Sequence, residues 1–297
     1  RRAVQYATLG RAYLLQGRVG DADKTLNQSY RLAPVMETGL ALSEIREKAG
    51  DNSAALDFAI GAALTGKMTA PERQKLEGIY RKTHGGSLEG LDATLDAEFA
   101  RRRATPLTPS RYTPTAARTN RVALAEFATG AACLPCIAVD VAFDAALERY
   151  TRDEVALLVY HIHAPTSDPL SNASAQARTK YSDIHGAPTV RIDGRAVTLG
   201  EGTRTVAGPV FRALDAEIGR RLEVAPGVNL TLTAARSGSR VHVTATVDHL
   251  AAPAAGARLR LALVERQVSY SGENGLRFHP MVVRSLAQPP GAPADGF

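Results

Sequence analysis

Both cysteines of this 297-residue chain lie in one short segment, Cys133-Leu134-Pro135-Cys136. A spacing of two residues lets one turn of helix bring the second sulfur within bonding reach of the first. The flanking apolar patterns predict a strand and turn before the segment and a helix that opens with it. The free N–H groups and the positive dipole end of a helix favour thiolate over thiol, and the thiolate is the species that attacks disulfides. The segment therefore indicates thiol–disulfide exchange.

Helix geometry also distinguishes the two thiols. Cys133 is expected at the open end of the first turn, partly exposed and facing the helix N–H groups, which should lower its pKa. Cys136, three residues further on, is expected beneath that turn and more buried. We therefore expect Cys133 alone to be alkylated rapidly near neutral pH.

Two other roles for the cysteine pair stay open from the residue types. The thiols could bind a metal together with His161 and His163, since alternate strand positions share one face of a sheet. They could also form a purely structural disulfide, although their position at a helix start argues against this. With two cysteines in all, the chain can build neither a scaffold of several disulfides nor a zinc site with four Cys ligands.

Residues 120–222, which contain the cysteine segment, alternate strand patterns with helix patterns. Such alternation is typical of βαβ units and of a sheet covered by helices. The expected strands are 121–127, 154–163 and 190–192, and the expected helices are 137–150, 171–184 and 206–222.

Over about 100 residues, from Arg121 to Leu222, the sequence resembles the thioredoxin family. Three features carry the resemblance, and they occur in the family's order. The first is a strand, a turn, the CxxC segment and a helix. The second is Ala187-Pro188-Thr189, whose proline lies 52 positions after Cys136 and just before a strand. The third is the closing amphipathic helix.

The resemblance implies a role for each of these residues. Cys133 would be the nucleophile and Cys136 the resolving thiol. Pro188 would follow a cis peptide bond and pack against the disulfide. The backbone of Ala187 and Thr189, on either side of it, would pair with a substrate peptide as a short added strand. No cofactor and no metal are implied.

The chain departs from the family pattern at three places. Ala132 stands where the family usually has Trp before the first cysteine, and the chain contains no Trp. Leu134 replaces the usual Gly, which leaves the direction of electron transfer open. The family's buried acid on the preceding strand has its nearest match in Glu126, seven residues before Cys133. Glu126 is our candidate proton acceptor for Cys136, with an exposed strand residue as the alternative.

Residues 1–104 have the apolar and Ala spacing of helices, with a repeat of about 34 residues. Leu9, Gly10, Tyr13, Ala22 and Pro34 resemble the tetratricopeptide pattern, in which small residues let paired helices approach closely. An unrelated helical domain is the alternative. Two less regular copies of the repeat are marked by Leu42, Gly50, Ala55 and Ala62, and then by Leu76 and Tyr80.

Two further segments complete the organisation. Residues 105–119 are rich in Pro, Thr and Ser and predict an extended linker. Residues 223–297 alternate apolar and polar positions between Gly and Pro clusters. This pattern predicts an antiparallel β-module that resembles half of a sandwich, and we expect the module to be incomplete. The expected fold class is thus multidomain: a tetratricopeptide-like helical repeat, a thioredoxin-like α/β domain and a C-terminal β-module.

Composition limits the partners. The chain has 36 Lys and Arg against 30 Asp and Glu, and this excess is spread along the sequence, so we expect no nucleic-acid partner. No apolar stretch reaches the roughly 18 residues of a membrane span. The chain starts with Arg, so we expect a fragment or a processed form. Thioredoxin-like domains with a β-module are often found in bacterial envelope proteins, which favours the periplasm over the cytoplasm.

Two functions are expected from the sequence. The first is a thiol–disulfide oxidoreductase that acts on a disulfide-bearing protein or peptide and has an unidentified redox partner. The alternative is a binding or assembly protein, in which the helical repeats hold a protein partner and the thioredoxin fold is a platform.

Overall fold

The computed structural model describes residues 1–103, 105, 107–250 and 259–287 of the chain. Its contacts divide into two compact units, which we call the helical unit and the sheet unit. By these contacts, part of the cysteine segment and a C-terminal segment belong with the N-terminal helices. The helical unit comprises Arg1–Thr105, Ala131–Leu134 and Gln267–His279, and the sheet unit comprises Pro106–Gly130, Pro135–Arg266 and Pro280–Phe297.

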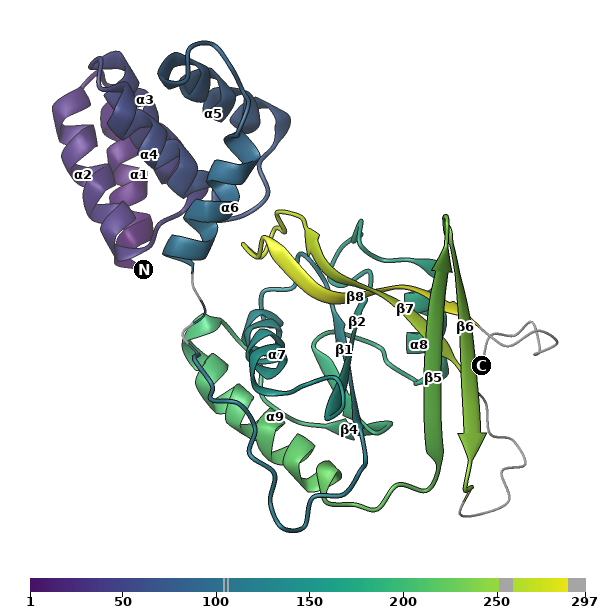
Figure 1. The fold of residues 1–297 in the computed structure, drawn as a ribbon. Coiled ribbons are helices and arrows are strands. Elements are labelled where there is room, and N and C mark those ends of the chain that lie inside the picture. The colour runs from purple at the N-terminus through teal and green to yellow at the C-terminus, as the bar shows by residue number, and fades with distance from the viewer. Residues whose placement is uncertain (104, 106, 251–258, 288–297) are drawn as a thin grey trace. The chain divides into compact units, whose positions relative to one another are not determined.

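The N-terminal residues form helices in which the first packs against the second, the third against the fourth and the fourth against the fifth (Figure 1). The first, third and fifth helices start 34 residues apart, at Arg2, Met36 and Ala70, which is the predicted repeat length. The Asp51 carboxylate accepts a hydrogen bond from Ala54 N at 3.0 Å and so fixes the start of one helix. The helices are α1 (Arg2–Leu15), α2 (Val19–Leu32), α3 (Met36–Lys48), α4 (Asn52–Ala63), α5 (Ala70–Thr83) and α6 (Leu91–Arg102).

Small residues bring the paired helices close together, as the repeat pattern predicts. A Cβ atom on Gly10 of α1 would lie 2.6 Å from Leu26 Cγ of α2, a distance that no real side chain tolerates. Ala22 and Ala55 are fully buried between helices. The helical hairpins are thus present, while their assignment as tetratricopeptide repeats stays a prediction.

The sheet unit is built on a mixed sheet whose strand order is β4-β3-β1-β2-β8-β7. β1 runs parallel to β2 and antiparallel to β3, and β3 pairs antiparallel with β4. The strands are β1 (Ala123–Thr129), β2 (Val155–His161), β3 (Thr189–Ile192), β4 (Arg195–Val197), β7 (Leu261–Ser269) and β8 (Phe278–Ala287).

Helices cover both faces of the first strands of this sheet (Figure 1). α7 (Ile137–Arg149) and α9 (Ala207–Leu222) lie on one face, and α8 (Ala173–Tyr181) lies on the other. Phe127 of β1 meets Phe143 of α7 with their ring centroids 5.0 Å apart, which marks the core on the α7 face. The predicted alternation of strands and helices in 120–222 is therefore present, as a mixed α/β arrangement.

The prediction of a separate β-module at 223–297 is wrong for the described residues. β5 (Asn229–Ser237) and β6 (Arg240–Asp248) form a two-stranded antiparallel sheet, but β7 and β8 join the main sheet. β8 lies beside β2, with Val159 opposite Val282. Val282 and Val283 point to opposite faces and both are fully buried, so this strand is covered on both faces. The expectation of an incomplete module concerned residues 288–297, which lie outside the described residues.

The predicted linker packs against the sheet unit. Tyr112 N donates to Arg149 O at 2.9 Å, and Thr119 N donates to Leu222 O at 3.0 Å. These bonds tie the segment to the ends of α7 and α9. The described residues of 107–119 form no helix or strand, as predicted.

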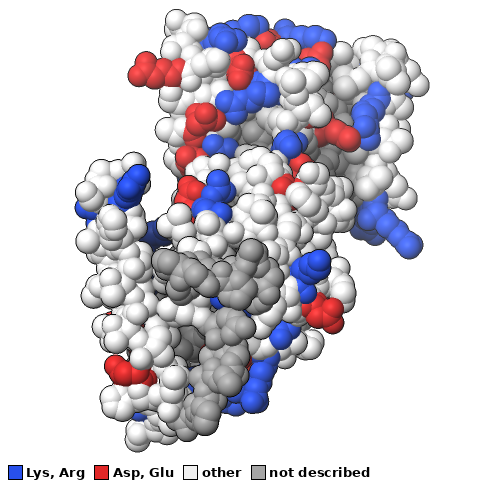
Figure 2. Space-filling view, turned by 90° about the vertical axis from the view of Figure 1, so that its right-hand side faces the viewer, with Lys and Arg blue, Asp and Glu red and all other residues white. Residues whose placement is uncertain are grey.

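Surface charge is mixed on the face drawn in Figure 2, where Lys and Arg are interspersed with Asp and Glu. The Arg101–Arg103 run ends α6, and Glu98 pairs with both Arg101 and Arg102 at 2.6 Å. Carboxylates thus balance part of the tightest basic run. Within the described ranges, no helix combines the length and the apolar character needed to cross a membrane.

Candidate functional site

The cysteine segment lies where β1 passes into α7, as predicted. Cys133 and Cys136 are joined as a disulfide. α7 begins at Ile137, with Cys136 as its N-cap residue, and its C-cap is Tyr150. The Cys136 carbonyl accepts hydrogen bonds from Val139 N and Asp140 N, each at 2.9 Å. The helix start therefore fixes the backbone of the second cysteine.

The expected exposure of Cys133 is wrong. The residue is only 2% exposed, and Cys136 is fully buried. A segment that lies far away in the sequence, the turn between β7 and β8, contacts the backbone of this loop. Asn274 N donates to Ala131 O at 3.0 Å, and Asn274 Nδ2 donates to Cys133 O at 3.4 Å. Local helix geometry cannot anticipate a cover that comes from 141 residues further along the chain.

Pro188 lies at the carboxyl end of β1. The Ala187–Pro188 peptide bond is cis, which confirms that prediction. β3 begins with Thr189, whose register partner is Ala128, the residue before the last of β1. Since β1 continues into the cysteine segment, this register places Pro188 at the same edge of the sheet. Its contact with the two sulfurs stays a prediction. Ala187, Pro188 and Thr189 are all half-buried.

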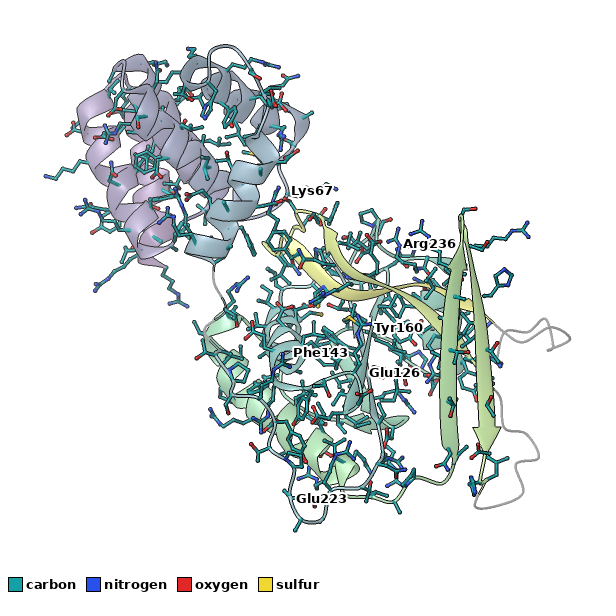
Figure 3. All side chains as sticks on the ribbon, in the orientation of Figure 1. Lys67, Glu126, Phe143, Tyr160, Glu223 and Arg236 are labelled. Carbon is teal, nitrogen blue, oxygen red and sulfur yellow. The ribbon has the colours of Figure 1, made fainter. Side chains whose placement is uncertain are left out.

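Glu126 is buried, but on the face of the sheet that α8 covers. Its carboxylate accepts hydrogen bonds from Arg178 Nε and from an Arg178 terminal nitrogen, both at 2.8 Å, and from the Tyr160 hydroxyl at 3.2 Å. Burial raises the pKa of the Tyr160 hydroxyl, and the Glu126 charge raises it further. Figure 3 shows Glu126 and Tyr160 on the side of β1 away from Phe143. This carboxylate is thus engaged by Arg178 on the face opposite α7.

A buried carboxyl that the sequence analysis missed lies on the α7 face. Asp140 follows Cys136 by four residues and so projects from the same side of the helix. Thr129 Oγ1 of β1 donates to Asp140 Oδ2 at 3.3 Å. Burial raises the pKa of the Asp140 carboxyl well above its usual value, and the Asp144 charge adds to this. The sequence does contain a signal for this residue, because Asp140 is an acid between Val139 and Val141 in an otherwise apolar helix pattern.

The two histidines considered as metal ligands are bonded to one aspartate instead. His161 Nδ1 and Asp168 Oδ2 are 2.8 Å apart, and both side chains are buried. His163 Nδ1 accepts a hydrogen bond from Asp168 N at 3.0 Å. His161 is level with Thr129 in the parallel register and therefore shares its face, the one that α7 covers. The part of the chain that the structure describes holds no group of three or more His, Cys, Asp or Glu arranged for a metal ion.

Asp144, one turn beyond Asp140, gives a pH-dependent stability that can be measured. Burial raises the pKa of its carboxyl to about 7, opposed by Arg204 and supported by Glu148. The folded chain therefore binds an extra proton between about pH 4 and pH 7, so stability falls as pH rises through this window. We expect Asp144→Asn to be more stable than the wild type by about 2 kcal/mol at pH 8, with no gain at pH 4. Urea denaturation at both pH values measures this.

The matched control for this prediction is Asp153→Asn, which removes an exposed carboxylate after the same helix. It should change stability little at either pH, because a solvated carboxylate has no burial penalty to relieve. An equal gain for Asp144→Asn at pH 4 and pH 8 would contradict the assigned cause.

The helical unit contains a cavity of about 550 Å³. Its apolar wall comes from α1 and from the connection between α2 and α3. Two ion pairs border it, Arg11 with Glu37 and Lys67 with Glu273, both at 3.2 Å. The apolar lining residues include Val4, Ala7, Pro34, Val35 and Met36.

The structure thus gathers Thr129, Asp140 and His161 on the α7 face of the sheet, next to the strand end that leads to the disulfide, and leaves Glu126 on the other face. Comparison with protein-family models, with curated proteins and with solved structures found no match to this chain. Its function is therefore inferred from the geometry of the site.

Proposed function

We propose that this chain is a thiol–disulfide oxidoreductase of thioredoxin type that acts on protein or peptide disulfides. The observation that carries the proposal is the Cys133–Cys136 disulfide at the junction of a central parallel strand and a helix N-terminus. Helix N-termini stabilise thiolate, and a pair that alternates between dithiol and disulfide needs one such sulfur.

The proposed fold of residues 120–222 is thioredoxin-like. It is supported by the order of strand, CxxC segment, helix and parallel strand, followed by a cis proline that opens an antiparallel strand pair. For residues 1–104 we propose tetratricopeptide-like repeats. Their support is the helices that start 34 residues apart and the close approach at Gly10.

The proposed reaction moves two electrons from the dithiol to the substrate. The Cys133 thiolate attacks one sulfur of the substrate disulfide, a mixed disulfide forms, and the other substrate sulfur leaves as a thiolate that takes up a proton. The Cys136 sulfur then attacks the Cys133 sulfur. The Cys133–Cys136 bond forms, the mixed disulfide breaks, and the second substrate thiol is released. A dithiol substrate reacts with the Cys133–Cys136 disulfide by the same steps in reverse and gives up two electrons to it.

We assign the proton acceptor for Cys136 to Asp140 rather than to Glu126. Cys136 must lose its thiol proton as it attacks, and Asp140 projects from the same side of α7 beside it. Burial raises the pKa of its carboxyl well above the usual value, which favours the protonated form and suits a group that takes up this proton and returns it in the reverse step. Glu126 lies across the sheet with its charge balanced by Arg178.

The proposed substrate contacts are the backbone groups of Ala187 and Thr189, two half-buried residues next to Pro188. An extended substrate segment would hydrogen-bond to them as a short added strand, which holds its disulfide at the sheet edge where the cysteine segment begins. The reaction needs no metal and no cofactor in this proposal.

A redox titration of the cysteine pair tests the proposal. Catalytic pairs have potentials between about −270 and −120 mV, whereas structural disulfides lie below about −300 mV. We expect a value in the catalytic range, measured by equilibration with glutathione and mass analysis, together with turnover of insulin disulfides. A value below −300 mV without turnover would identify the bond as structural.

Binding of a protein partner is the second candidate function, and the cavity in the helical unit favours it. Its apolar wall and its two bordering ion pairs suit a peptide with apolar side chains. A redox potential below about −300 mV, together with no turnover of insulin disulfides, would favour this binding function over the enzyme.

A further inference from the structure

The turn between β7 and β8 lies directly on the cysteine segment. We call residues 270–279 the C-terminal hairpin. Asn274 is 7% exposed, and its backbone and side-chain nitrogens bind the carbonyls of Ala131 and Cys133. The Asn274 Oδ1 atom also accepts a hydrogen bond from Leu276 N at 3.0 Å, which shapes the turn. A Cβ atom on Gly272 would lie 2.6 Å from Ala131 O. The hairpin is thus in close contact with the cysteine loop.

The same hairpin is held by the N-terminal helices within the helical unit. Arg277 pairs with Asp96 of α6, and Phe278 packs edge-on against Phe99 at 5.5 Å. Lys67, labelled in Figure 3, pairs with Glu273 at the other side of the turn. These contacts hold the hairpin against the N-terminal helices.

Backbone packing anchors the turn as well. A Cβ atom on Gly275 would lie 2.9 Å from Thr65 O, and Gly275 has a positive φ of 81°. Only glycine meets both demands, because other residues rarely adopt this conformation and would also meet the Thr65 carbonyl. The Asn274-Gly275 pair therefore serves two partners, the cysteine loop and the connection between α4 and α5.

A covered Cys133 limits the disulfides that it can attack. Exchange requires the attacking sulfur to lie in line with the substrate disulfide, so it depends on access as well as on thiolate character. A small thiol or disulfide needs only a brief opening, whereas a folded protein substrate needs the hairpin to move away from the loop.

We propose that Asn274 is a positioning residue that holds the C-terminal hairpin over Cys133, and that this cover makes the site discriminate against bulky protein disulfides. The inference rests on the proposed function for its biological meaning. The hairpin closes the site through the Cys133 carbonyl, and the helices that carry the hairpin set how readily it opens.

The experiment compares two reagents that share one reactive group and differ in size. N-ethylmaleimide and a 5-kDa polyethylene glycol maleimide both attack the same thiolate, so the ratio of their rates cancels the pKa of the thiol. In a Cys136→Ser chain only Cys133 can react. The size ratio is the rate of the small reagent divided by the rate of the large one. We expect this ratio to be at least about tenfold higher for the folded chain than for the chain unfolded in urea.

Asn274→Asp is the decisive variant. The carboxylate keeps the acceptor for Leu276 N but lacks the N–H₂ donor to the Cys133 carbonyl. We expect the size ratio to fall about fivefold, the effect of losing one net hydrogen bond. Asn229→Asp makes the same chemical change on an exposed residue of the β5–β6 sheet and should leave the ratio unchanged.

Each outcome decides the proposal. If the folded Cys136→Ser chain, with Asn274 still in place, has a size ratio near that of the unfolded chain, the hairpin does not cover Cys133 and the proposal is overturned. This result does not depend on whether an Asn274 variant folds. An unchanged ratio in Asn274→Asp, with circular dichroism like that of the parent chain, overturns the role of Asn274. Neither readout needs turnover, so failure of the enzymatic proposal in the insulin assay remains distinguishable from failure of the cover.

Discussion

Replacing Cys136 by Ser is expected to stop turnover after one step and to leave the chain joined to its substrate through Cys133. The Cys133 thiolate still attacks, but the residue that would attack the mixed disulfide has lost its sulfur. Insulin reduction should fall to the uncatalysed rate. An adduct that disappears on treatment with dithiothreitol should accumulate, and intact-mass analysis measures it.

Cys133→Ser should also abolish turnover, without an adduct, because the first step is lost. Leu134→Ser is the matched control, since it places the same new residue at the exposed position between two retained cysteines. It should turn over without accumulating a mixed disulfide. Equal adducts on Cys133 and Cys136 in the two single variants would contradict the assignment of nucleophile and resolving thiol.

Replacing Gly130 by Ala is expected to destabilise the chain by about 3 kcal/mol or more. A Cβ atom at this position would lie 2.1 Å from the Ala164 carbonyl oxygen and 3.4 Å from the Ile162 carbonyl oxygen. Both are backbone atoms that follow β2, so relief requires the chain itself to shift. Gly130 directly precedes the cysteine loop, and the shift should therefore reach the disulfide as well. The urea midpoint measures the loss of stability.

Gly219→Ala is the matched control for this prediction. Gly219 lies within α9, and a Cβ atom there meets nothing within 4 Å. Alanine favours helix over glycine by roughly 0.8–1 kcal/mol, so this variant should be slightly more stable than the wild type. A loss below 1 kcal/mol for Gly130→Ala would mean that the close approach to Ala164 is not maintained in solution.

The cysteine segment, the strand before it and the helix after it could be predicted because they depend on neighbouring residues. Apolar spacing predicted α7 to about Tyr150, and the structure ends the helix at Arg149 with Tyr150 as its C-cap. The cis bond before Pro188 followed from a resemblance over a short motif, again a local feature. The helix pairs of residues 1–104 were likewise predicted from spacing.

The face on which each buried acid lies was harder to predict. A shift of one residue along a strand moves a side chain to the other face of the sheet. Glu126 and Phe127 are neighbours, yet Arg178 binds the first and Phe143 packs on the second. Distance along the chain favoured Glu126, whereas the position of Asp140 on the same side of α7 as Cys136 became significant only with the helix in place.

The sequence by itself determined which sulfurs can pair, since only two exist and two residues separate them. It also determined that they lie at a junction of strand and helix, because that follows from apolar periodicity in adjoining segments. Only the tertiary structure decided that Cys133 is covered, that β7 and β8 extend the main sheet, and that Asn274 binds the cysteine loop. These features depend on pairing between segments more than 100 residues apart. The alternation of apolar and polar residues predicts that a segment is a strand, but it does not predict which other segment the strand pairs with.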